Sequence, residues 1–457
     1  KDLQIGEKVY INDGMIQMVV ESHTDTEATC KVLQGGLISN HKGVNLPHTT
    51  MSVSVLAEKD KVFLEHVHEL NIDYIALSFV SSPEDITMTR DILKSLGHPI
   101  PIIAKIERET AVQNIIEIIQ TTDIVMVARG DLGVEIGIER VPQIQKMILQ
   151  EATKYIKPVI VATQMLESMT TGLTATRAEV SDVANAIYDS ASCVMLSGET
   201  AVGKYPILTV QTMRRVIDES EKEFKYRDYF FHQLRKNFYD VPSAVSAATV
   251  KTCYSAAAKG IIICTMKGMT ARSISRFRPS LPILALTPSL KTYNQLAMNW
   301  GIIPIHQRAS TVSEAIHHVS EYALERGILS YGDLIVVTAG SPFNVSGSTN
   351  MMIVDIIGDV LVRGEGHGEG GTIHGQVAIA LSPNDEALYE AKNKILILSS
   401  CTHQYAKVIE NSIGVILQNH PEDAESEAIA LELAAKNNLP IITRADNALT
   451  ILQEQQF

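Results

Sequence analysis

The sequence predicts an α/β fold with parallel sheets, and the evidence is a pattern that recurs along the chain. Residues 100–133 hold two apolar strands that end in charged residues, Lys105-Ile106-Glu107 after the first and Arg129-Gly130-Asp131 after the second. A helix-like segment follows each strand, and the pattern returns at residues 158–169 and 193–206. Strands that alternate with helices pack as a parallel sheet, and functional groups gather where such strands end.

The charged residues at the two strand ends predict a site for a metal and a phosphate. Residues two apart in a strand face the same side, so Lys105 and Glu107 should project together. Glu107 and Asp131 offer hard oxygen ligands for Mg²⁺, and Lys105 offers a point charge for phosphoryl oxygens. The alternative is an ordinary ion pair at a strand end and a Gly-Asp turn.

Composition narrows the class of protein. The 457 residues include 39 Lys and Arg against 52 Asp and Glu, a net charge of −13, which argues against nucleic-acid and anionic-membrane partners. At this length two to four domains are expected. The five cysteines form no C-x-x-C pair, and no stretch approaches the roughly 18 apolar residues of a membrane span. These features favour a cytoplasmic enzyme.

The four strand-end blocks, together with residues 176–186 between the third and the fourth, resemble pyruvate kinase over residues 3–357. The resemblance implies a partial (β/α)8 TIM barrel in residues 51–224, after a remnant of a β lid domain in residues 1–50. The lid remnant would begin with a hairpin at residues 8–20, turning at Asn12-Asp13-Gly14. Five barrel strands are expected, at residues 73–80, 101–107, 123–129, 158–163 and 193–197.

The family's first three barrel strands and the first half of its lid have no counterpart in this sequence. An open remnant of five strands would expose strand edges and apolar faces that normally need cover. A truncated chain, or one completed by another chain, is therefore expected.

The later part of the chain predicts further α/β domains. A helix at residues 207–224 and a linker at 225–239 lead to an open α/β domain for effector binding and assembly at 240–357. Its expected helices are 244–259, 271–277, 293–300 and 312–326, and its expected strands are 260–265, 282–287, 302–305 and 333–338. A glycine-rich linker at 364–371 precedes the tail.

The tail, residues 365–457, resembles the swivelling phosphohistidine domain of some bacterial pyruvate kinases. Its expected strands are 394–399, 413–417 and 439–443, with a helix at 425–436. Glu427 stands where phosphotransfer members carry histidine, so phosphotransfer by this domain is not expected.

The resemblance implies phosphoryl transfer from phosphoenolpyruvate to ADP, giving pyruvate and ATP in the last step of glycolysis. Lys105 would stabilise the transferring phosphoryl group, and Glu107 and Asp131 would hold Mg²⁺ or Mn²⁺. The amides of Gly130 and Asp131, with the Thr163 hydroxyl, would hold the substrate carboxylate, and Ser197 would join the relay that protonates the enolate. The family also needs K⁺, whose Asn, Ser, Asp and Thr ligands fall in the absent segment.

A second site is expected where a strand turns into a helix in the α/β domain. The resemblance implies that a sugar-phosphate or nucleotide effector binds there, at Thr265, Lys267, Gly268 and Thr270. The alternative is a routine turn. The resemblance also implies a homotetramer, with residues 177–186 in a subunit interface, whereas a solvated helix is the other interpretation.

Two other functions stay open at this point. A Mg²⁺-dependent lyase or aldolase acting on pyruvate enolates can use a similar barrel, although the block Met195-Leu196-Ser197-Gly198-Glu199-Thr200-Ala201 favours the kinase. The other is a catalytically impaired, effector-binding fragment left by truncation.

Overall fold

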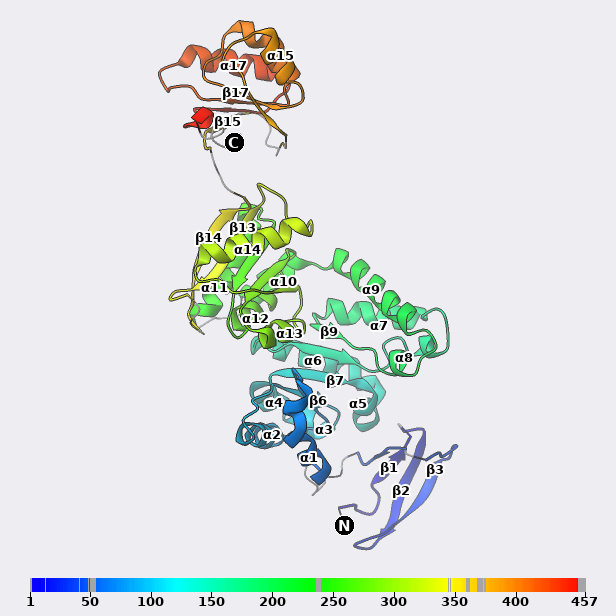
Figure 1. The fold of residues 1–457 in the computed structure, drawn as a ribbon. Helices are drawn as coiled ribbons and strands as arrows, with labels where there is room; N and C mark the ends of the chain where they lie inside the picture. The colour runs from blue at the N-terminus through cyan, green and yellow to red at the C-terminus, as the bar shows by residue number, and fades with distance from the viewer. Residues whose placement is uncertain are drawn as a thin grey trace. The chain divides into compact units, whose positions relative to one another are not determined.

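The computed structural model describes residues 2–450 except 13, 41, 48, 50–54, 236–239, 344, 346, 359–361, 368–372 and 374. The chain divides into two compact units, which are described one at a time (Figure 1). The first comprises Lys1–Leu329 with Leu334–Asp355, and the second comprises Ser330–Asp333 with Ile356–Phe457.

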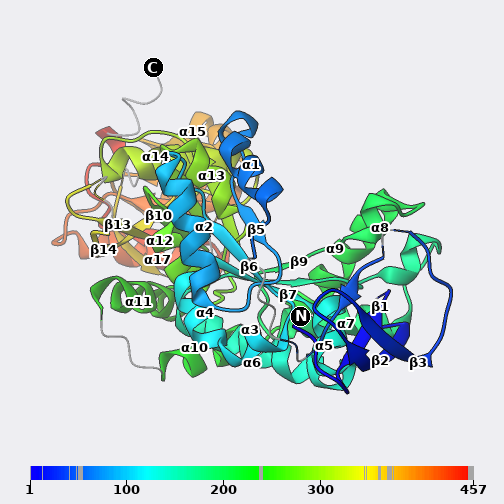
Figure 2. The same ribbon diagram turned by 90° about the horizontal axis from the view of Figure 1, so that it is seen from below.

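The first unit opens with a small antiparallel sheet in the order β3-β2-β1-β4. Its strands are β1 (Lys8–Ile11), β2 (Ile16–His23), β3 (Ala28–Gln34) and β4 (Val44–Asn45). The predicted hairpin is confirmed: β1 pairs with β2, and Asn12 and Gly14 take positive φ angles of 56° and 81° at the turn. Asp13 lies outside the described residues. Figures 1 and 2 both place this sheet beside helix α5.

A parallel sheet of five strands follows, in the order β5-β6-β7-β8-β9. The strands are β5 (Ile75–Leu77), β6 (Ile102–Ile106), β7 (Ile124–Ala128), β8 (Val159–Ala162) and β9 (Cys193–Val194). All five predicted strands are therefore present, each shorter than expected, and all four pairings are parallel. Every residue of β7 is buried, which explains its unbroken apolar run.

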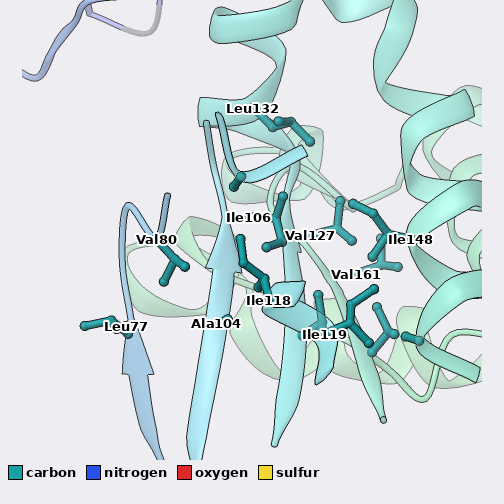
Figure 3. Packing of buried hydrophobic residues seen from close by; sticks show 14 of the residues in the cluster. Leu77, Val80, Ala104, Ile106, Ile118, Ile119, Val127, Leu132, Ile148 and Val161 are labelled. Carbon is teal, nitrogen blue, oxygen red and sulfur yellow. The ribbon is translucent and has the colours of Figure 1, made fainter. Parts of the chain in front are cut away.

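Helices cover this sheet and supply its core. They are α1 (Glu58–His66), α2 (Pro83–Ser95), α3 (Glu109–Gln113), α4 (Ile115–Thr121), α5 (Arg129–Ile136), α6 (Val141–Lys154), α7 (Arg177–Tyr188), α8 (Gly198–Ala201) and α9 (Pro206–Glu223), with short 3₁₀ turns at Val67–Leu70, Ile138–Arg140 and Glu167–Thr170. Ile106 and Val127 of the strands pack with Ile118, Ile119 and Ile148 of α4 and α6 (Figure 3). The predicted helix at 207–224 is confirmed as α9.

A second five-stranded sheet, in the order β12-β11-β10-β13-β14, completes the first unit. Its strands are β10 (Gly260–Cys264), β11 (Ile283–Thr287), β12 (Ile302–His306), β13 (Leu334–Gly340) and β14 (Thr349–Ile356). Its helices are α10 (Tyr226–Leu234), α11 (Val241–Ala256), α12 (Met269–Ser275), α13 (Leu290–Leu296) and α14 (Val312–Glu325). The predicted elements are present, within a few residues at their ends.

In this region one expectation was wrong and one strand was not predicted. The predicted linker at 225–239 contains helix α10, because Phe230 is fully buried and packs edge-on against Phe277 with ring centres 5.7 Å apart. Strand β14 was not predicted, because Met352 and Val354 point outward from this edge strand and hide the alternation of polar and apolar residues.

The second unit holds a sheet in the order β15-β19-β18-β17-β16, parallel except for β15. Its strands are β15 (Glu365–His367), β16 (Val377–Ile379), β17 (Ile395–Leu398), β18 (Gly414–Leu417) and β19 (Ile441–Thr443). Its helices are α15 (Asp385–Glu390), α16 (Ala406–Asn411) and α17 (Ala424–Lys436), with a 3₁₀ turn at His403–Tyr405. The expectation of a linker at 364–371 was partly wrong, because β15 lies within this range and pairs antiparallel with β19. His367 Nε2 lies 2.9 Å from Thr443 Oγ1.

Candidate functional site

The end of strand β6 holds a buried ion pair. Lys105 Nζ lies 2.6 Å from Glu107 Oε1, so the prediction that these side chains project together is confirmed. Glu107 is 1% exposed and the Lys105 side chain 24%, which leaves the ammonium group as the solvent-facing partner. Phe79 N donates to Glu107 Oε2 at 2.6 Å, and Lys105 Nζ donates to Ser78 Oγ at 2.8 Å. A buried carboxylate that is paired and hydrogen-bonded in this way is held in one position.

The neighbouring strand β7 ends at Ala128, and helix α5 begins at once with Arg129. The chain therefore turns helical at Arg129, the last residue of the strand expected at 123–129. Asp131 lies in the first turn of α5, where the positive end of the helix dipole favours a carboxylate. Gly130 N donates to Thr163 Oγ1 at 2.8 Å, which joins this turn to the end of strand β8.

Thr163 follows β8 in a strained conformation. Its φ is +70°, in a region that β-branched residues rarely adopt, and the next residue, Gln164, has φ +54°. The hydroxyl is fixed, because it accepts from Gly130 N and donates to Ala162 O at 2.6 Å. Strain of this kind often accompanies function.

Arg129 links the ends of strands β7 and β8 to helix α7, and the sequence analysis did not single it out. Its guanidinium donates to Thr163 O at 2.9 Å and to Ala162 O at 3.2 Å, and it pairs with Asp182 of α7 at 2.7 Å. The position of this basic residue directly before Gly130 could have marked it as a candidate site residue. Nothing in the sequence, however, identified Asp182 as its partner.

A cavity of about 710 Å³ opens beside these residues. Gly130, Asp131 and Thr163 line it together with Lys8 and Tyr10 of β1. The fold thus brings three of the predicted site residues to one cavity between the small sheet and the parallel sheet. Lys105 and Glu107 are not among its lining residues.

Ser197 lies just beyond strand β9, next to a buried acid. Its Oγ is buried and has no hydrogen-bond partner within the described residues. Ser197 N donates to Glu199 Oε2 at 2.8 Å, and Leu166 N donates to Glu199 Oε1 at 3.1 Å. Glu199, 0% exposed, therefore fixes the backbone around Ser197, a role that its place in the sequence did not reveal. Burial, and then the charges of Glu199 and Glu179, raise the pKa of nearby Glu167.

The metal prediction depends on only two carboxylates. Within the described ranges, no group of three or more His, Cys, Asp or Glu residues could hold an ion. Mg²⁺ usually keeps several waters and is bound through one or two carboxylates plus substrate oxygens. Glu107 and Asp131 suit such a site, because both are hard anionic ligands that follow neighbouring strands of one sheet.

The expected effector loop follows strand β10. Thr265 Oγ1 accepts from Gly268 N at 3.0 Å, and Gly268, with φ +78°, is the N-cap residue that precedes α12. A Cβ at Gly268 would lie 3.0 Å from Leu296 Cδ2, so a larger residue would be both strained and crowded. Thr265, Lys267 and Thr270 line a small pocket of about 50 Å³. The Thr270 and Thr349 hydroxyls are 2.6 Å apart.

Glu427, in the second unit, is held by two partners. Arg444 Nε lies 3.1 Å from Glu427 Oε2, and Asn419 Nδ2 donates to the same oxygen at 2.9 Å. These hydrogen bonds, the one from Asn419 first, lower the pKa of Glu427. Arg444 also pairs with Glu365 of β15 at 3.0 Å. The position where a carrier histidine was sought is therefore an ion-paired carboxylate.

The first unit has the architecture of α/β enzymes that act on charged substrates where parallel strands end. Residues 1–210 match the family model for the pyruvate kinase barrel domain, and residues 243–354 match the model for the pyruvate kinase alpha/beta domain. The chain belongs to the pyruvate kinase family and is a phosphotransferase.

Individual relatives agree with the family models. Pyruvate kinases of Staphylococcus aureus strains USA300 and NCTC 8325 are each 36% identical to the chain over 451 residues, covering 98% of this chain and 76% of theirs. The crystal structure of a pyruvate kinase from Cryptosporidium parvum superimposes with a TM-score of 0.74 at 33% identity, covering 78% of this chain and 73% of that one. In the described part of the chain, no helix is both long and apolar enough to cross a membrane.

Proposed function

We propose that the chain transfers the phosphoryl group of phosphoenolpyruvate to ADP, giving pyruvate and ATP, at the ends of strands β6, β7 and β8. The observation that carries this proposal is the buried Lys105–Glu107 pair, with its cation towards solvent. Phosphoryl transfer needs positioning and charge neutralisation more than covalent chemistry, and this pair provides a fixed positive charge. Membership of the family supports the reaction over the lyase or aldolase alternative.

Each charged residue then has a defined role. Lys105 places its ammonium group beside the phosphoryl oxygens and neutralises charge that develops as the group moves. Glu107 and Asp131 hold Mg²⁺ or Mn²⁺, which supplies positive charge to the substrate oxygens when it is bound. Glu107 has a second function, because its bond from Phe79 N keeps the Lys105 side chain aligned.

We place the binding site of the substrate carboxylate at the contact between Gly130 and Thr163. The N–H of Gly130 donates to Thr163 Oγ1, and that hydroxyl donates to Ala162 O. A carboxylate that accepts from the amides of Gly130 and Asp131 and from the Thr163 hydroxyl would replace both of these bonds. These groups line the cavity of about 710 Å³, which gives the substrate access.

Ser197 is proposed to take part in proton delivery to the enolate. Its hydroxyl is buried without a partner among the described residues, and such a group needs an explanation. A substrate or water that accepts its hydrogen bond would provide one. Glu199 holds the Ser197 backbone and acts as a positioning residue.

The direct test is the reaction itself. Purified chain with phosphoenolpyruvate, ADP, Mg²⁺ and K⁺ should form pyruvate and ATP in equal amounts, followed by a coupled assay for pyruvate and a luminescent assay for ATP. Pyruvate formed without ADP, or cleavage of a carbon–carbon bond in a pyruvate-derived substrate, would contradict the proposal. Omission of ADP and omission of Mg²⁺ are the controls.

The proposal extends to regulation and assembly. The pocket at Thr265, Lys267 and Thr270 fits a phosphate group of a sugar-phosphate or nucleotide effector, and Gly268 shapes the turn. Helix α7 exposes Val180 and Tyr188, in keeping with a subunit interface of a homotetramer. Sedimentation that shows only monomer at all concentrations would exclude the tetramer.

The second unit is proposed to act through packing and not through phosphotransfer. A carrier needs an imidazole nitrogen as nucleophile, whereas Glu427 is ion-paired to Arg444. After incubation with labelled phosphoenolpyruvate, mass spectrometry should find no base-stable phosphate on residues 364–457. Label on the exposed His403 or His420 would restore a carrier role, and a histidine phosphocarrier protein run in parallel is the positive control.

A further inference from the structure

Another large cavity lies where the strands of the parallel sheet begin, at the opposite end of the strands from the proposed active site. It measures about 540 Å³ and is lined by residues at the beginnings of strands: Tyr74 before β5, Pro101 before β6, Ile124 of β7 and Pro158 before β8. Residues of helices α12 and α13, which pack with the second sheet, line its other side. A strand of five residues spans roughly 15 Å, so the two sites lie at the two ends of the same strands.

Four cations line this cavity, which we call the basic cavity: Lys157, Lys267, Arg272 and Lys291. None of the four forms an ion pair with a carboxylate within the described residues. The hydrogen bonds of these cations go to neutral backbone carbonyls: Lys157 Nζ donates to Thr122 O at 2.6 Å, and Lys291 Nζ donates to Pro99 O at 3.2 Å. Arg272 Nη2 donates to Lys267 O at 3.1 Å.

Little negative charge offsets these cations. Among the described lining residues the only carboxylate is Asp123, and it is already engaged by Arg90 at 3.0 Å and by Ile102 N at 2.9 Å. Burial is the main reason that the pKa of Lys157 is lowered; the charge of Asp123 raises this pKa, and the nearby charges of Arg90 and Arg272 lower it, so these positive groups lie close enough to disfavour one another. An anion between them would relieve the desolvation and the repulsion together.

We propose that the basic cavity binds a phosphorylated small molecule, whose phosphate lies between Lys157 and Arg272 with Lys291 at the rim. The volume falls in the range of small-molecule sites and exceeds that of one phosphate ion. The ligand would join the two sheets of the first unit, since Lys157 precedes β8 whereas Arg272 and Lys291 belong to α12 and α13. Tyr74, which precedes β5, already links the parallel sheet to α13, because its OH donates to Gln295 O at 2.8 Å.

This site differs from the proposed effector pocket. That pocket is lined by Thr265, Thr270 and Thr349, and none of these residues lines the basic cavity. Lys267 borders both cavities and is therefore left unchanged in the test. The proposed active site shares no lining residue with the basic cavity.

Lysine protection in the full chain tests the proposal locally. The chain is acetylated briefly in Mg²⁺-free buffer, and the modified lysines are quantified by mass spectrometry. With inorganic phosphate at ten times its Kd, labelling of Lys157 and Lys291 should fall about tenfold, because only the empty fraction reacts. Lys154 and Lys251, which lie outside the cavity, should be labelled equally with and without phosphate. Parallel arms with a sugar phosphate and a nucleoside monophosphate identify the source of the phosphate.

Variants and salt controls decide the outcome. Arg272→Gln should abolish the protection of Lys157 and Lys291, and Lys291→Gln, an exposed and structurally mild change, should weaken the protection of Lys157. Lys251→Gln should leave it unchanged. Unchanged labelling in all three ligand arms, or equal protection by chloride at the same ionic strength, would overturn the proposal. Binding at the active site or effector pocket cannot produce the expected pattern, because those sites contain neither lysine.

Discussion

Replacement of Lys105 by methionine should lower turnover by about 10²–10³, the scale for losing one preorganised charge partner of a transition state. Methionine keeps most of the side-chain volume and removes the ammonium group that lies 2.6 Å from Glu107. Binding of phosphoenolpyruvate should weaken less than turnover falls, because the carboxylate contacts of Gly130 and Thr163 remain. The measurement is kcat and KM for phosphoenolpyruvate at saturating ADP and Mg²⁺.

Loss of stability must be separated from loss of chemistry in this variant. Removing one partner of a buried ion pair costs on the order of 3 kcal/mol, because Glu107 is left as a buried unpaired charge. Assays should therefore run well below the melting temperature of the variant. Lys154→Met, which breaks only the surface pair with Glu151, is the matched control and should keep full activity. Turnover of Lys105→Met within a few-fold of the parent would remove Lys105 from the mechanism.

Glu107→Gln and Asp131→Asn should each raise the Mg²⁺ concentration that gives half-maximal rate. Each change deletes one anionic oxygen ligand and keeps the shape of the side chain. At Glu107 the amide oxygen can still accept from Phe79 N, so the loop after β5 should keep its position. The measurement is a Mg²⁺ titration of the initial rate, repeated with Mn²⁺.

The control for the metal titration is Glu117→Gln, an exposed carboxylate of helix α4. It changes the net charge of the chain by the same amount and should leave the titration unchanged. If the two site variants titrate like the parent, the metal ligands are misassigned. Circular dichroism and melting curves of all three variants show whether the fold persists.

Sequence reasoning predicted contacts within the candidate site only where residues are neighbours along one strand. Period-two spacing was enough to pair Lys105 with Glu107, and unbroken apolar runs were enough to find all five strands. The Arg129–Asp182 pair joins residues 53 positions apart, and Glu199 reaches the backbone of Leu166 across 33. Such contacts form only when the folded sheet brings distant segments together, so no local sequence pattern predicts them.

The missed elements have a similar physical cause. Helix α10 is stabilised by the burial of Phe230 against a distant ring, and strand β15 by pairing with β19, about 76 residues later. Neither has a strong preference of its own. Conversely, the helices that were placed within a few residues, such as α9 and α14, carry clear apolar stripes.

The left-handed conformation of Thr163 bears on attempts to engineer this enzyme. A glycine or asparagine at this position would relax a backbone that costs threonine on the order of 1–3 kcal/mol, so a search for thermostable variants would select such replacements. Each would also discard the hydroxyl that accepts from Gly130 N. If Thr163 binds substrate as proposed, a library screened by heat resistance alone would therefore enrich stable but inactive variants, and residue 163 should be held fixed in any such screen.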